Sequence, residues 1–195
     1  EMQRSLVGSE MCIRDRDDTF SANVGAGADG EINKITYTSY VDGEGIAQER
    51  IVIVGAFTTF NGKSVPGLAV LNVDGTFDME FELKAMEGGR PNFAKIVDLT
   101  PYSDIHKPHL VISGTFNKYA GITRQGFLIL DMKGNAIQEF NVPGRFYGEL
   151  YDVQYSLTSD YANGLLLTGD FTSFDGKRMN NIVMLKVDVK NVVNR

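Results

Sequence analysis

Short apolar runs alternate along the chain with polar, glycine-rich stretches, and the runs come in three pairs. The first run of each pair covers residues 51–54, 110–112 or 165–167, and the second covers 68–71, 127–130 or 182–185. The runs are short, rich in branched residues and bounded by glycine or polar residues, which is typical of β-strands. Because the runs are continuous and do not alternate with polar residues, we expect each sheet to be buried on both faces.

The three pairs are copies of one repeat, whose central glycines Gly55, Gly114 and Gly169 stand 59 and then 55 positions apart. Further strands are expected before each first run, at 32–38, 94–99 and 150–157, and after each second run, at 77–83, 136–142 and 191–193. No amphipathic helical period lies between the runs, and radially stacked antiparallel sheets bury both faces without helices. We therefore predict an all-β partial β-propeller of about three four-stranded antiparallel blades, an open fragment of a larger ring.

Turn signals separate the expected strands. They are Asn61-Gly62, Ala120-Gly121 and Asp175-Gly176 between the paired runs, and Asp74-Gly75 and Lys133-Gly134 after the second runs. Asp-Gly is typical of tight hairpins in which both central residues take positive φ, and Lys-Gly is a weaker version of that signal. The third copy departs from the pattern at residues 188–190.

The composition and charge of the chain mainly exclude classes of function. A chain of 195 residues with 43% hydrophobic residues suits one ordinary globular domain. Its net charge of -6 repels phosphate backbones, so a nucleic-acid partner is disfavoured. No apolar run approaches the roughly 18 residues of a membrane-spanning helix, so no transmembrane segment is expected.

The N-terminal segment does not resemble the rest of the protein. Ser5 to Arg16 spell SLVGSEMCIRDR, which resembles the translation of a transposase-type DNA library adapter. We interpret residues 1–16 as non-native, the alternative being a native polar arm, so that any targeting signal would be unobservable. Cys12, the single cysteine, lies in this segment, so the native part is expected to lack disulfide and thiol chemistry.

The propeller fragment would then cover residues 17–195, with blades at roughly 30–83, 92–142 and 148–195. Asp18-Thr19-Phe20 resembles the tail at 78–81 of the first unit and is interpreted as the end of a preceding blade. Because propellers need about four to eight blades to close, the remaining blades of a parent ring are expected as partners.

The copies share one motif, an apolar strand followed by Gly-x-Phe, a second aromatic residue, a glycine turn and a second apolar strand. Residues 169–176 carry the fullest version, with Asp170 at the position of Ala56 and Thr115. With this motif the chain after Asp17 resembles the delta-60 repeat family of bacterial β-propellers, whose function is unknown. The resemblance implies a large secreted or surface-attached bacterial parent, and thus an extracellular or cell-surface location. It brings no catalytic residues.

Two residues are candidate ligand-binding residues, Asp170 and Tyr119. Asp170 could line a channel or bind a cation, or it could bond backbone amides of the following turn. The recurrent aromatic residues could stack on sugars, but their repetition favours packing between blades. They are Phe57, Phe60, Phe116, Tyr119, Phe171 and Phe174. The repeat glycines are expected to permit a bulge or a close backbone approach.

Other candidate sites are weaker. Residues 72–78 alternate oxygen ligands like a calcium loop but lack its spacing, so a hairpin is expected. His106 and His109 could in principle bind zinc, but Pro108 and Lys107 favour a solvated loop. The acids Glu80, Glu82, Glu87 and Asp98 are expected on the solvated surface. No nucleophile motif or phosphate loop is present, so we predict no catalytic residue, no metal site and no cofactor.

Three functions remain open. The first is a non-catalytic interaction or scaffold module that binds an unknown protein or carbohydrate through loops such as 84–92 and 102–109. The second is a glycan-binding or glycan-processing propeller, whose catalytic version needs paired acids. The third is a purely structural spacer, and an enzyme is not favoured.

Overall fold

The computed structural model describes residues 16–101, 106–137, 144–159 and 162–187, and these form three larger antiparallel sheets, two small ones and one short helix. Blade 1 consists of β1 (Ile32–Val41), β2 (Ala47–Gly55) and β5 (Leu68–Asn72). Blade 2 consists of β7 (Pro91–Asp98), β8 (Pro108–Gly114) and β11 (Phe127–Leu130). Blade 3 consists of β12 (Tyr147–Leu157), β13 (Asn163–Phe174) and β15 (Ile182–Lys186). Every predicted first and second run lies in one of these strands.

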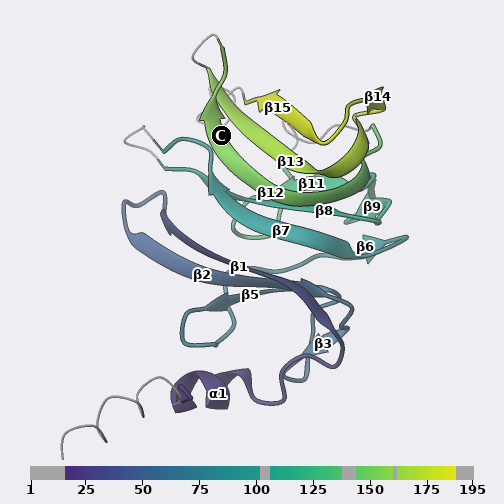
Figure 1. Cartoon of the computed structure of the whole chain (residues 1–195). Helices are drawn as coiled ribbons and strands as arrows, with labels where there is room; N and C mark the ends of the chain where they lie inside the picture. The colour runs from purple at the N-terminus through teal and green to yellow at the C-terminus, as the bar shows by residue number, and fades with distance from the viewer. Residues whose placement is uncertain (1–15, 102–105, 138–143, 160–161, 188–195) are drawn as a thin grey trace, which may run out of the picture.

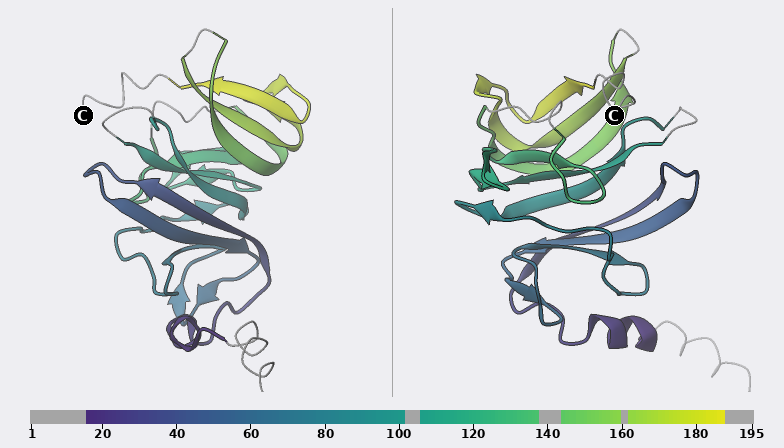
Figure 2. Two further views of the ribbon diagram at one scale, coloured as in Figure 1. Left: turned by 60° about the vertical axis from the view of Figure 1, so that its left-hand side comes forward. Right: turned by 180° about the vertical axis from the view of Figure 1, so that it is seen from behind.

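The blades are stacked in chain order (Figure 1), and turning the molecule shows the same order from the side and from behind (Figure 2). Side chains from adjacent blades meet in shared apolar clusters. Val52 and Leu68 of blade 1 share one cluster with Ile112 of blade 2, and Phe93 of blade 2 shares another with Leu167 of blade 3. The expectation that the sheets are buried on both faces is thus confirmed for blade 2. The described part of the chain forms an open stack, not a closed ring.

The first strands of the blades, β1, β7 and β12, lie next to one another and are joined by polar contacts. The hydroxyl of Thr36 donates to the carbonyl oxygen of Ala94 at 2.8 Å, which links blade 1 to blade 2. The ammonium of Lys95 donates to Oδ1 of Asp152 at 2.7 Å, which links blade 2 to blade 3. These contacts hold β1, β7 and β12 in register across the stack.

The repeat glycines sit opposite β-bulges, as expected. A Cβ at Gly55 would lie 2.0 Å from the carbonyl oxygen of Glu31, and one at Gly169 would lie 2.0 Å from that of Glu149. Gly114 is equally crowded by Arg90, at 2.2 Å. The strand register shifts beside each of these glycines, between residues 32 and 34, 91 and 93, and 150 and 152. A side chain there would separate the strands, so the glycine is required.

Six short strands lie at one end of the blades. They are β3 (Thr59–Phe60), β4 (Lys63–Ser64), β6 (Met86–Glu87), β9 (Lys118–Tyr119), β10 (Ile122–Thr123) and β14 (Lys177–Arg178). Of these, β3 pairs with β4, both β6 and β10 pair with β9, and β14 pairs with β13. Both residues of Asn61-Gly62, Ala120-Gly121 and Asp175-Gly176 have positive φ, so these predicted turns are confirmed. At Asp74-Gly75 only the glycine does, at +87°, which corrects that expectation. Asp74 instead accepts a hydrogen bond from the backbone N–H of Thr76 at 3.0 Å.

The prediction of a fourth strand is wrong for blade 1, where residues 77–83 are reduced to a single bridge between Leu71 and Phe77. In blade 2 Leu130 bridges Ala136 at the start of the strand expected at 136–142, and residues 138–142 lie outside the described residues. In blade 1 the reason is local, because Oδ1 of Asp78 accepts a hydrogen bond from the backbone N–H of Glu80 at 2.9 Å and turns the chain away. The expected strand at 191–193 and the turn at 188–190 lie outside the described residues, as do residues 1–15.

Residues 18–20, expected as the extended tail of a preceding blade, instead begin helix α1 (Asp18–Val24). The side chain of Asp17 caps this helix, accepting a hydrogen bond from the N–H of Phe20 at 2.9 Å. Ala28 then bridges Phe60, much as Met86 pairs with Tyr119 before blade 2, so the segment lies where an inter-blade linker lies. No helix in the described ranges has both the length and the apolar character needed to cross a membrane.

Candidate functional site

A groove of about 270 Å³ lies between blades 1 and 2, at the end where β1 turns into β2. Blade 1 and the segment after it contribute Tyr40, Asp42, Gln48, Arg50, Asp78 and Glu80. Blade 2 contributes the start of β8 at Pro108 and the turn formed by Asp131, Met132 and Lys133. The groove thus combines one aromatic residue and several charged groups with two apolar residues, Pro108 and Met132. A wider depression of about 550 Å³ lies on the other side of the same hairpin, around Glu49 and Val73.

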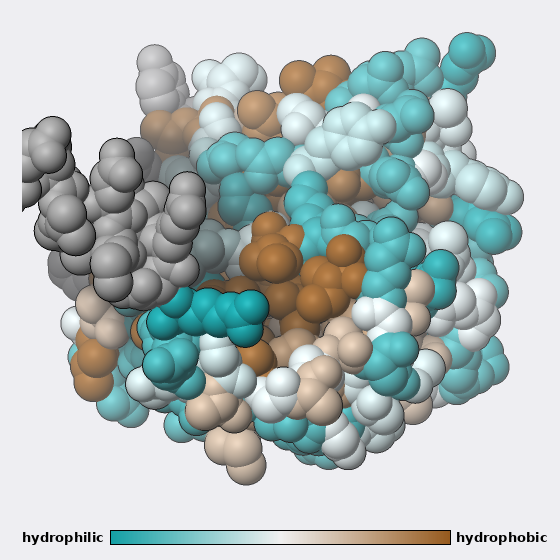
Figure 3. All heavy atoms as spheres, turned by 60° about the horizontal axis from the view of Figure 1, so that its bottom comes forward, coloured by the Kyte–Doolittle hydropathy of each residue, from teal (hydrophilic) through white to brown (hydrophobic). Residues whose placement is uncertain are grey.

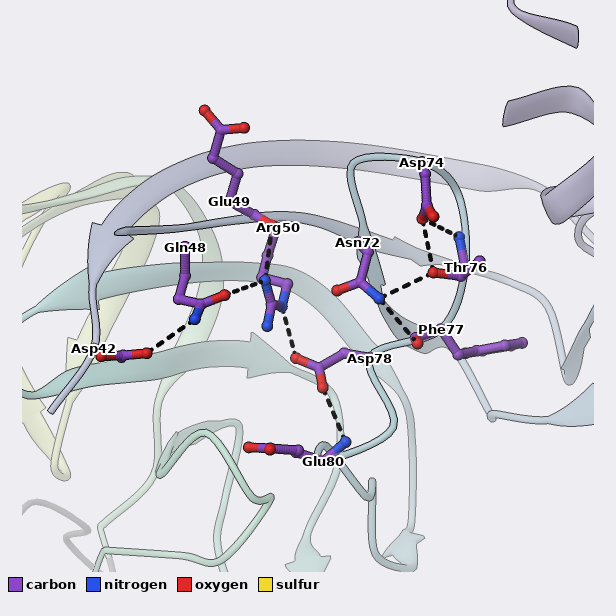
Figure 4. A network of polar contacts seen from close by, with 10 residues as sticks. All are labelled: Asp42, Gln48, Glu49, Arg50, Asn72, Asp74, Thr76, Phe77, Asp78 and Glu80. Carbon is purple, nitrogen blue, oxygen red and sulfur yellow. Dashed lines mark hydrogen bonds and ion pairs between the residues drawn. The ribbon is translucent and has the colours of Figure 1, made fainter. Parts of the chain in front are cut away.

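A chain of hydrogen bonds fixes the blade 1 wall of the groove (Figure 4). The amide of Gln48 donates to Oδ2 of Asp42 at 2.9 Å and its oxygen accepts from Nη1 of Arg50 at 3.0 Å. The Nε of Arg50 donates to Oδ2 of Asp78 at 2.7 Å, forming an ion pair that is 17% exposed on the arginine side and 6% on the aspartate side. The guanidinium is therefore held by Asp78 and Gln48, and it links these two side chains on the blade 1 side of the groove.

Other groups of the groove have no such partner. The hydroxyl of Tyr40 makes no hydrogen bond within the described part of the chain, although this side chain is only 9% exposed. The Glu80 carboxylate and the Lys133 ammonium likewise have no hydrogen-bond partner among the described side chains, and both residues are exposed. These three groups keep their full hydrogen-bonding capacity for a ligand.

Burial and charge shift the protonation of the groove in different directions. Burial raises the pKa of Tyr40, with nearby Asp78 and Asp42 acting in the same sense, so the phenol stays protonated. Hydrogen bonds from the N–H of Ile46 and from Gln48 lower the pKa of Asp42. Burial acts against the charge of Arg50, but the bond to Asp78 and the nearby negative charges raise its pKa overall. At neutral pH Asp42 and Arg50 are therefore charged and Tyr40 is neutral.

The three groove positions of blade 1 differ from their equivalents in blade 2. Strand register places Tyr40 where blade 2 has Leu99, and Arg50 where it has His109. Asp78 and Ile137 correspond as well, because each donates its backbone N–H to the matching residue of the preceding strand, Val70 or Ile129. Sequence reasoning missed this set. The available signal was a charged residue, Arg50, directly before an apolar run where the other copies have histidine or glycine.

The two predicted ligand residues lie apart from this groove. The Tyr119 side chain is 1% exposed, and its hydroxyl donates to the carbonyl oxygen of Gly134 at 2.7 Å and accepts from the N–H of Lys84 at 3.1 Å. Asp170 is exposed on β13, opposite Glu149 on β12. The structure does not bring them together, and their ligand-binding role stays a prediction. All six recurrent aromatic residues are buried at 6% exposure or less, as the packing interpretation predicts.

The expectation of a solvated loop is wrong for His109, which lies in β8, whereas His106 precedes this strand and is partly buried. His109 begins the buried part of β8 at 4% exposure, with Nδ1 2.8 Å from the carbonyl oxygen of Lys107. His106 lies 2.7 Å from Oδ2 of Asp98, an acid expected at the surface whose side chain is only 14% exposed. Among the described residues no group of three or more His, Cys, Asp or Glu side chains is placed to hold a metal ion. Residues 102–105 of the expected binding loop lie outside the described ranges.

The comparison with known families bears on blade 1. Residues 50–81 match a β-propeller domain of unknown function, DUF5122. This match confirms the resemblance to a β-propeller family of unknown function, and it spans β2, β5 and the segment that carries Asp78 and Glu80. No curated protein and no solved structure matches the chain. The DUF5122 match thus supports the propeller architecture and leaves the role of the groove to its chemistry.

Proposed function

We propose that the protein is a non-catalytic recognition module that binds its partner in the groove between blades 1 and 2. One observation carries the proposal: Tyr40, Arg50 and Asp78 are replaced by Leu99, His109 and Ile137 at the second junction. A blade therefore stacks without these polar residues. Buried polar groups that a fold does not need are costly to keep, so they point to a ligand.

The proposal is non-catalytic in part because the pKa of Asp42 is lowered. Oδ1 of Asp42 accepts hydrogen bonds from the N–H groups of Glu44 and Ile46. Such bonds oppose the protonation that a general acid requires. The glycan alternative in its aromatic-platform form has less support, since the six recurrent aromatic side chains are buried.

The proposed setting is a larger propeller at a bacterial cell surface, as the family resemblance implies, in which further blades of this repeat cover the ends of the stack. Ile35 and Tyr37 of blade 1 are 62% and 57% exposed, whereas their equivalents Ala94 and Ile96 in blade 2 are at most 1% exposed beneath blade 1. Apolar side chains gather on the face where α1 lies (Figure 3). At the other end Ile182 is 59% exposed.

A second copy of the chain offers the faces that such blades would present. We expect weak, concentration-dependent association in sedimentation velocity, reduced by Ile182→Glu and by Ile35→Glu. Unchanged association in both variants would contradict a role for the end faces.

The recognition role is tested with arrays of glycans and of peptides, probed with the full chain and with a triple variant. The variant Tyr40→Leu, Arg50→His, Asp78→Ile copies the blade 2 residues into blade 1, so we expect folding to be preserved while the groove loses the Tyr40 hydroxyl and the Arg50–Asp78 ion pair. We expect signals from the natural chain that the triple variant loses and that Asp170→Ala retains. Signals that survive in the triple variant, or none at all with either array, would favour a structural spacer.

A further inference from the structure

We propose that the groove binds a lysine side chain of a protein partner. The ammonium would lie between Glu80 and the two aspartates Asp42 and Asp131, and the aliphatic stem would lie along Met132. This inference rests on the proposed recognition function and specifies its ligand.

The charge of the groove favours a cation. Arg50 and Asp78 neutralise each other at 2.7 Å, which leaves Asp42, Glu80 and Asp131 against the single charge of Lys133. Three carboxylates facing one ammonium give a net negative site, and the whole chain adds a net charge of -6 that attracts cations over longer distances. An anionic ligand would be repelled on both counts.

Two of these carboxylates are anchored but keep acceptor sites. Both oxygens of Asp42 accept hydrogen bonds, Oδ1 from two backbone N–H groups and Oδ2 from Gln48. Asp131 is held in the same way by the N–H groups of Lys133 and Asn135 and by the Asn135 amide. A carboxylate has about four lone-pair sites, so each retains one on Oδ2 for an incoming ammonium. The carboxylate of Glu80 keeps all of its sites.

The remaining walls suit an aliphatic stem with a polar end. Pro108 and Met132 offer apolar surface beside the carboxylates, which is the arrangement along which a lysine extends its methylene groups. Tyr40 is the independent sign of a ligand, because this residue lines the groove at 9% exposure and its hydroxyl has no hydrogen bond to the described residues. An ammonium donates three hydrogen bonds and can use this oxygen as one acceptor.

The test is an NMR titration of the full chain with N-acetyl-lysine methylamide and, separately, with its norleucine analogue, which lacks the ammonium. We expect the lysine probe to shift backbone signals of Tyr40, Glu80 and Lys133 and the norleucine probe to leave them unchanged. Glu80→Gln should weaken binding about tenfold, and added salt should weaken it further. The matched control is Glu149→Gln, an exposed acid of blade 3, which should stay within about twofold of the natural chain. Thermal denaturation of both variants verifies that they fold.

Each other outcome overturns the inference in a distinct way. Equal shifts with both probes would show an apolar site, and shifts outside the groove would show a different one. If the lysine probe has no effect while an array glycan binds and requires Tyr40, Arg50 and Asp78, the recognition function stands and its lysine ligand is wrong. If no array ligand depends on these residues and the lysine probe also fails, both proposals fail together.

Discussion

The two junctions of this stack have the same strand geometry but different chemistry at one end. At the first junction Tyr40, Arg50 and Asp78 line an open polar groove, whereas at the second junction Leu99 is buried at 1% exposure and Ile137 packs against the same apolar cluster. The inner parts of both junctions are apolar. The comparison indicates that stacking depends on the apolar positions inside each junction. The positions of Tyr40, Arg50 and Asp78 at its end can differ without loss of stacking.

The largest expected effect comes from a matched pair of inner positions, Phe93 and Lys34. Both occupy the first position after the bulge, and Phe93 is fully buried between blades 2 and 3. Phe93→Ala should lower the free energy of unfolding by about 4 kcal/mol, because it leaves a cavity in the second junction. Lys34→Ala should cost about 1 kcal/mol, since it removes a cation–π contact at 4.4 Å from the Phe93 ring and a hydrogen bond from the Lys34 ammonium to the carbonyl oxygen of Tyr151. Denaturant titration measures both, and equal losses would remove the distinction between the junctions.

The next effect is at the groove. Arg50→Ala should destabilise the protein by about 3 kcal/mol, because it leaves the Asp78 carboxylate, 6% exposed, without its cation. The double variant Arg50→His, Asp78→Ile should recover most of that loss, since it installs the blade 2 residues and removes the buried charge. A double variant as unstable as Arg50→Ala, measured by denaturant titration, would mean that the ion pair is needed to build blade 1.

The second junction should respond to pH through His109. Burial lowers the pKa of this imidazole below its ordinary value of 6.5, and the charge of Lys107 lowers it further. The hydrogen bond with the Lys107 backbone and the charges of Asp131 and Asp98 raise the pKa, but by less. Below about pH 6.5 the unfolded chain therefore binds more protons than the folded one, and stability falls as the pH falls. Between about pH 7.5 and 5.5 the natural chain should lose about 1 kcal/mol more than His109→Gln. Parallel pH curves for the two proteins would contradict this.

The smallest effect is expected at Asp170, where the copies also differ. Asp170 is exposed and directly opposite Glu149 across β12 and β13, so the two like charges repel. Asp170→Thr, which copies Thr115 of blade 2, should raise the free energy of unfolding by about 0.3 kcal/mol. A loss above about 1 kcal/mol would show that this carboxylate has a structural partner.

The strands, the glycine bulges and the short hairpin turns could be predicted from the sequence because each depends on neighbours along the chain. The apolar runs around Val52 and Leu68 predict buried strands, and the residue types of Asn61-Gly62 predict a turn. The helix at 18–24 was missed because its capping residue, Asp17, follows the adapter-like segment and the similarity to residues 78–81 suggested an extended tail. The fourth strand of blade 1 was overestimated because a single side chain, Asp78, ends the pairing.

The repeat by itself determined the architecture, since local periodicity and turn residues recur in each copy and suffice to specify stacked antiparallel strands. Only the tertiary structure decided which positions face a ligand. Tyr40, Asp78 and Asp131 are far apart along the chain, and they meet because blade 1 stacks on blade 2 in one register. That register follows from side-chain packing across the junction, which no single copy of the repeat contains. The polar groove is therefore a property of two blades together and could not be read from either copy alone.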